Sequence, residues 1–154
     1  MVYLATAEVR DEEMAERIIR HQQQRPPEWL TVEAPLDITG PLLKYQSGYT
    51  VLLDCLTMYL SNLYFHYEST CHAQELDGII LEKFNELVQV ILNSKANIII
   101  VTNEVGWGIV PENFIARKFR DLSGTVNQYI AGVCNEVYLL VCGIPMKIKG
   151  GLEA

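Results

Sequence analysis

Four short apolar runs, separated by segments with helical periodicity, constrain the fold of this 154-residue chain more than any other feature. The runs lie near residues 2–5, 49–53, 97–101 and 137–142. Strands that alternate with helices form a mostly parallel sheet with helices on both faces, because each parallel connection must cross over the sheet. The sequence therefore predicts an α/β protein, and its length fits a single domain over residues 1–154.

Helices are expected between these runs. The acidic residues at 11–13 favour the start of a helix, which Pro26-Pro27 ends. A short extended piece at 31–33 leads to a helical turn at 35–44, and a helix follows Asp54. Apolar residues recur every three or four positions from Ala73 to Leu92, and again in a last helix that is entered through Pro111-Glu112.

The charge balance excludes several function classes. There are 12 Lys and Arg against 19 Asp and Glu, and the net charge of -7 opposes non-specific binding to nucleic acid or to an anionic membrane. No apolar run approaches the roughly 20 residues that span a bilayer, and no secretory signal is visible, so we expect a cytoplasmic protein. The four cysteines contain no C-x-x-C pair and are interpreted as buried free thiols. The spacing of His66, Cys71 and His72 matches no standard zinc pattern.

Polar residues follow the expected strands, where ligands bind to open parallel sheets. The four runs end at Ala5-Thr6-Ala7, Asp54, Thr102-Asn103-Glu104 and Gly143, which we expect on one rim. The segment Val51-Leu52-Leu53-Asp54 resembles the acidic strand of P-loop proteins, whose carboxylate helps to hold magnesium; a surface strand that ends in Asp is the alternative. The phosphate-loop motif G-x-x-x-x-G-K-[ST] is absent from the sequence, whose first glycine is Gly40.

The third run is followed by a glycine-containing loop at 103–111, which is either a ligand loop or a simple connection. Arg117, Lys118 and Arg120 on the next helix are interpreted most simply as a solvated face. Trp29 and Trp107 are interpreted as packing residues rather than as stacking platforms.

His21 is the most informative single residue. If its helix continues to about residue 24, Arg17 lies one turn before it and Arg25 one turn after it, which predicts two guanidiniums beside an imidazole. Nearby positive charge keeps an imidazole neutral, so that it can attack phosphorus while the arginines hold phosphate oxygens. The alternative is a histidine that packs on the face formed by Met14 and Ile18.

Several ordered motifs extend over nearly the whole chain. They are Arg17-Ile18-x-x-His21-x-x-x-Arg25-Pro26, Trp29-x-Thr31-Val32-Glu33, Asp54-Cys55-Leu56-Thr57-Met58-x-x-Ser61-Asn62-Leu63, the stretch 103–113, Arg117-Lys118-Phe119-Arg120-Asp121, Gly124-x-x-Asn127-Gln128 and the ending 143–149. Together they resemble the adenosylcobinamide kinase/adenosylcobinamide-phosphate guanylyltransferase family of cobalamin biosynthesis.

The resemblance implies a RecA-like P-loop fold and two reactions. Adenosylcobinamide is phosphorylated with ATP, and GMP is then transferred from GTP to the phosphate through a histidine–GMP intermediate. His21 matches the guanylylated histidine, and Asp54 the residue that would hold Mg²⁺. The positions that match nucleotide contacts are Ala5, Thr6, Ala7, Gln22, Gln23, Gln24, Arg25, Glu33 and Asp54. The expected partners are adenosylcobinamide, its phosphate and the nucleotides, in a homo-oligomer; the alternative is a non-catalytic remnant that only binds nucleotide or packs in an oligomer.

The sequence departs from the family at its front. Family members begin with a strand, a glycine-rich phosphate loop and a helix, about 25–30 residues by typical element lengths, before the segment that starts here at Val2. A miscalled start, a truncation and a real loss of the loop are three alternatives. We expect the upstream DNA to encode the segment in frame. Without it, the neighbouring strands would expose apolar faces and the kinase step would be weak.

Overall fold

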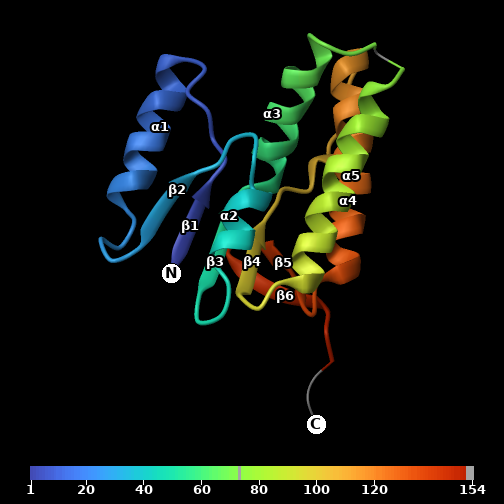
Figure 1. Cartoon of the computed structure of the whole chain (residues 1–154). Helices are drawn as coiled ribbons and strands as arrows, with labels where there is room; N and C mark the ends of the chain where they lie inside the picture. The colour runs from blue at the N-terminus through green and yellow to red at the C-terminus, as the bar shows by residue number, and fades with distance from the viewer. Residues whose placement is uncertain (73, 152–154) are drawn as a thin grey trace.

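Four parallel strands form the main sheet, in the order β2-β1-β3-β4. The computed structural model describes residues 1–72 and 74–151 (Figure 1). The strands are β1 (Val2–Ala5), β2 (Leu30–Glu33), β3 (Thr50–Asp54) and β4 (Asn97–Val101). The predicted α/β fold with a mostly parallel sheet is therefore confirmed.

The helices follow the sequence pattern with small differences at their ends. They are α1 (Glu12–Gln23), α2 (Thr39–Lys44), α3 (Leu56–Glu68), α4 (Leu76–Asn93), the 3₁₀ turn η1 (Val105–Trp107) and α5 (Phe114–Val133). The predicted helix start at Ala73 lies outside the described residues. The entry to α5 is a correction: Asn113 caps it by accepting a hydrogen bond from the Ala116 backbone N–H, and Pro111 lies before the helix.

Two of the three crossovers leave the central strands in opposite directions, and the third passes from β2 through α2 back to β3. From β1 the chain passes through α1 to β2 on one side, and from β3 it passes through α3 and α4 to β4 on the other. Because such crossovers are right-handed, α1 lies on one face and α3 and α4 lie on the opposite face. Figure 1 shows α1 standing apart from the group formed by α3, α4 and α5.

The core lies between the sheet and the helices α2 to α5. Val2, Leu4, Val51 and Leu53 are fully buried on this face. The rings of Tyr59 and Phe84 meet edge to face, with centroids 5.6 Å apart. On the opposite face β4 is less covered, since Ile99 and Val101 remain 48% and 41% exposed. Among the described helices, none is long and apolar enough to cross a membrane.

The apolar run at 137–142 does form a strand, but not in the main sheet. Strand β5 (Val137–Val141) pairs antiparallel with β6 (Ile144–Lys149) as a separate hairpin. Cys142 and Gly143 form its turn, with φ of 52° and 77°, a left-handed conformation that favours glycine. This corrects the sequence prediction for Gly143, which belongs to a hairpin turn rather than to the rim. The prediction of buried thiols is also wrong: the four cysteines are free, but Cys142 is exposed and Cys55, Cys71 and Cys134 are only half-buried.

Candidate functional site

The site predicted from the strand ends lies where the crossovers from β1 and from β3 diverge. Strands β1 and β3 are neighbours, and Ala5 and Asp54 at their carboxyl ends are paired in register. In open parallel sheets, the crevice at such a divergence is the usual place for a ligand, because the connecting segments leave toward opposite faces. The structure therefore brings Ala5, Thr6, Ala7 and Asp54 together at this position.

Thr6 joins the ends of these two strands. Its buried hydroxyl accepts a hydrogen bond from the Cys55 N–H and donates one to the Cys55 carbonyl, each at 2.8 Å. The Thr6 carbonyl accepts from Nδ2 of the buried Asn62 at 2.7 Å, and its N–H donates to the Asp54 carbonyl. Since its polar atoms are all engaged, the Thr6 side chain positions the site.

The carboxylate of Asp54 lies at the rim with one oxygen engaged. The hydroxyl of Tyr3 donates a hydrogen bond to its Oδ2. Burial and the neighbouring Asp54 raise the pKa of Tyr3 to about 12. Within the described residues, Oδ1 of Asp54 accepts no hydrogen bond from a side chain or backbone. A single available carboxylate oxygen fits Mg²⁺, which commonly takes one or two carboxylates and completes its shell with phosphate oxygens and water.

A groove of about 380 Å³ lies beside the ends of β1 and β2, and we call it the α1 groove. Its lining comprises Ala7, Glu8, Val9, Ile18, Glu33 and Pro35. Gln22 donates a 3.5 Å hydrogen bond from Nε2 to Glu33, so the last turns of α1 pass over the end of β2. Three predicted nucleotide contacts, Ala7, Gln22 and Glu33, thus come together at one groove.

His21 lies next to this groove, in the last turn of α1, three residues after Ile18 and one before Gln22. Its side chain is exposed, and among the described residues it forms no hydrogen bond or ion pair. The side chains of Gln23 and Gln24 are exposed as well. An exposed ring does not fit the alternative of a histidine packed on the face formed by Met14 and Ile18.

The two arginines that the spacing places beside His21 contact other groups. Arg17 pairs with Glu13 at 2.6 Å, and both side chains are largely exposed. The Arg25 guanidinium lies over the Tyr3 ring, 3.8 Å from its centroid, and donates to Thr31 Oγ1 at 3.3 Å. The helical spacing correctly predicted the helix that carries Arg17 and His21. It did not predict the contacts of the two arginines, because Glu13 and Tyr3 also lie within reach of their long side chains.

The glycine-containing loop between β4 and α5 is held by side chains of α5. Asn127 donates from Nδ2 to the Asn103 carbonyl at 3.1 Å and to Glu104 at 2.9 Å. Arg117 donates to the Pro111 and Glu112 carbonyls, at 3.0 and 2.6 Å. Arg120 donates from Nη2 to the Gly106 carbonyl at 2.6 Å. The solvated-face interpretation is thus wrong for both half-buried arginines, and also for Lys118, which is half-buried and pairs with Asp77 at 3.2 Å.

The role of these arginines in holding the loop could have been predicted from the sequence. A loop of about ten residues without strand or helix partners leaves carbonyl groups that need donors, and three basic residues on the next helix can supply them. The packing interpretation of the tryptophans is wrong for Trp107, which is 72% exposed on this loop. Trp29 is half-buried, and its ring centroid lies 6.4 Å from that of Tyr3.

Comparison with known proteins gives consistent matches along the chain. The family model for cobinamide kinase / cobinamide phosphate guanyltransferase matches residues 1–148. The bifunctional adenosylcobalamin biosynthesis protein CobU of Escherichia coli is 40% identical over 155 residues, which cover 97% of this chain and 86% of that protein. The CobU protein of Salmonella typhimurium is 39% identical, with the same coverage. The CobP protein of Pseudomonas aeruginosa is 38% identical over 96% of this chain and 82% of its own length.

Proposed function

This chain belongs to the cobinamide kinase / cobinamide phosphate guanylyltransferase family, a family of enzymes of cobalamin biosynthesis, and we propose that it carries out both reactions. It would phosphorylate the hydroxyl of adenosylcobinamide with ATP, weakly where the phosphate-loop motif is lacking, and then transfer GMP from GTP to that phosphate. The observation that carries the second step is the α1 groove, where Ala7, Gln22 and Glu33 meet beside the exposed imidazole of His21.

The guanylyl transfer proceeds in two displacements. A neutral ring nitrogen of His21 attacks the α-phosphorus of GTP, so that a P–N bond forms and the bond to pyrophosphate breaks. A phosphate oxygen of adenosylcobinamide phosphate then attacks the same phosphorus, which forms the new P–O bond and releases His21. His21 suits this role because its ring is exposed and, within the described part of the chain, is not engaged in a hydrogen bond.

The neighbouring residues would bind the nucleotide rather than react with it. Glu33 and Gln22 offer an acceptor and donors beside the α1 groove, as nucleoside recognition requires. The Arg17–Glu13 pair is solvent-exposed and therefore of little energetic value, so that Arg17 can exchange Glu13 for a phosphate oxygen. Arg25, whose buried Nε has no hydrogen-bond partner among the described residues, is a second cation at the end of the same helix.

Asp54 would hold Mg²⁺ through Oδ1, while the Tyr3 hydroxyl fixes the orientation of the carboxylate through Oδ2. When bound, the cation supplies positive charge that offsets the charge of the triphosphate and of the departing pyrophosphate. Thr6 keeps Asp54 in place by joining β1 to the backbone of Cys55, the next residue.

Labelling with GTP tests this proposal. Incubation with α-labelled GTP and magnesium should attach the label to the protein as an acid-labile, base-stable phosphoramidate, because the bond formed is P–N. His21→Ala should abolish the label, whereas His66→Ala, which removes an exposed histidine of α3, should retain it. Label that survives His21→Ala in folded protein would assign the nucleophile elsewhere, and wild-type protein that takes up no label would favour the non-catalytic alternative.

A further inference from the structure

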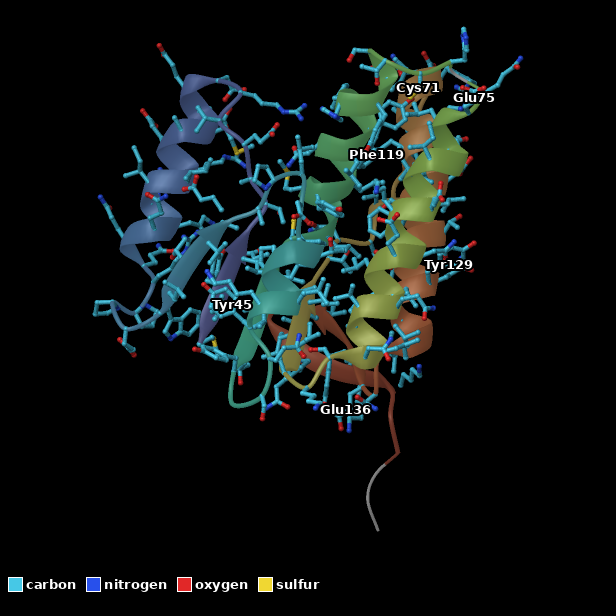
Figure 2. The ribbon with its side chains drawn as sticks, in the orientation of Figure 1. Tyr45, Cys71, Glu75, Phe119, Tyr129 and Glu136 are labelled. Carbon is cyan, nitrogen blue, oxygen red and sulfur yellow. The ribbon has the colours of Figure 1, made fainter. Side chains whose placement is uncertain are left out.

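A second groove lies on the other side of the rim, and the nucleotide site does not use it. It has a volume of about 490 Å³ and runs between α3 and the loop that leads into α5; we call it the α3–α5 groove. Its walls are mostly carbon and include Phe65, Val105, Ile109, Pro111 and Phe119. Figure 2 labels Phe119 in the space between α3 and the pair α4 and α5.

Several apolar side chains of this groove remain exposed, although Tyr64 is buried and Phe119 is half-buried. Phe65 is 48% exposed and Ile109 is 96% exposed. Such a cluster of exposed large apolar side chains around a concave surface is typical of a binding site. The groove also lies at the carboxyl end of the sheet: Ser61 lines it, and Thr57, one turn earlier on α3, accepts a hydrogen bond from the Asn103 N–H just after β4.

The groove wall contains one buried cationic group with an unused donor. Nη2 of Arg120 donates to the Gly106 carbonyl, but Nη1 is buried and has no partner among residues 1–72 and 74–151. A buried guanidinium N–H without an acceptor is destabilising, and a ligand that brings an oxygen acceptor relieves this cost. The ligand that fits is thus a bulky, carbon-rich molecule with oxygen acceptors at its periphery.

Resting on the proposed function, we propose that the α3–α5 groove binds the edge of the corrin ring of the cobinamide substrate. That edge bears methyl groups and side chains that end in carboxamides. The methyl groups would lie against Phe65, Ile109 and Phe119, and a carboxamide oxygen would accept a hydrogen bond from Nη1 of Arg120. The groove encloses only part of so large a molecule, which leaves the substrate's phosphate free to reach the α1 groove.

Equilibrium dialysis of cobinamide phosphate against the full chain, followed by corrin absorbance, tests the proposal. Arg120→Met should raise Kd about tenfold or more, since it removes a charged donor. Ile109→Ser should raise Kd about three- to tenfold by removing apolar contact. Leu140→Ser, at a 65% exposed position of β5 outside the groove, is the matched control and should bind as wild type.

The possible outcomes separate this proposal from the proposed function. Labelling of wild-type protein by GTP alone reports His21 chemistry, whereas dialysis without GTP reports the groove, so each can fail independently. Unchanged Kd in both groove variants would overturn the proposal. So would a change of oligomeric state in sedimentation without a change in Kd, because the groove would then be a contact between copies. If Arg120→Met does not fold, the Kd of Ile109→Ser tests the proposal alone. This variant should fold, because the Ile109 side chain is 96% exposed and contributes little to the core.

Discussion

Thr6→Val should destabilise the fold although it changes neither the size nor the shape of the side chain. The buried hydroxyl accepts from the Cys55 N–H and donates to the Cys55 carbonyl, both at 2.8 Å. Valine leaves the Cys55 N–H without its partner, whereas the Cys55 carbonyl still accepts a hydrogen bond from the Tyr59 N–H at 3.1 Å. Since a buried polar group left unpaired costs about 1–3 kcal/mol, we expect a loss of about 2 kcal/mol in the free energy of unfolding. In a chain of this length that lowers Tm by roughly 4–8 °C.

Urea denaturation followed by circular dichroism measures this effect. The midpoint for Thr6→Val should fall while the slope stays unchanged, because the surface exposed on unfolding is the same. Thr6→Ser is the matched control: it keeps the hydroxyl, loses one methyl group, and should cost only about 1 kcal/mol. A valine variant as stable as the serine variant would refute the view that this hydroxyl joins β1 to β3.

Two other perturbations test the rim. The Tyr3 pKa of about 12 lies above the ordinary value of 10.0, so Tyr3 stabilises the fold fully below pH 10, and this contribution is lost as the pH rises toward 12. Tyr3→Phe should therefore lose less stability than wild type between pH 10 and 12 in urea titrations, and an equally steep loss would contradict this assignment. Asn127→Leu removes hydrogen bonds to Thr102, Asn103 and Glu104, and should accelerate amide exchange in residues 103–108 about tenfold. Protection equal to that of wild type would show that the other donors of α5 hold the loop alone.

The parallel sheet could be predicted because both the strand pattern and the helix pattern are strong. The apolar run at 97–101 coincides with β4, and Asp11 and Pro26 bracket α1 as expected. The run at 137–142 also contains a strand, β5, but an apolar run does not indicate which other strand it pairs with. The two-residue turn at Cys142 and Gly143 decides the pairing locally, in favour of a hairpin.

The sequence predicted where the backbone of the candidate site lies, but not which groups its long side chains contact. The position of Asp54 and Thr6 follows from the topology, since the ends of neighbouring parallel strands meet at one edge. The partners of Arg17, Arg25 and Arg120 do not follow from spacing. A long flexible side chain reaches many groups, and only the folded arrangement determines which of them it contacts.

The β5–β6 hairpin has few contacts with the rest of the described structure, so its local stability can differ from that of the main sheet. It pairs only with itself among the described residues, and all six residues of β6 are exposed. It is tied to the end of α5 mainly by Lys149, whose ammonium donates to the Ala131 and Gly132 carbonyls. Glu136, labelled in Figure 2, adds an exposed ion pair to Lys147. The hairpin can therefore open as a separate cooperative unit while the main sheet stays folded. A reagent attached to the Cys142 thiol in its turn would report this local opening and not the unfolding of the whole protein.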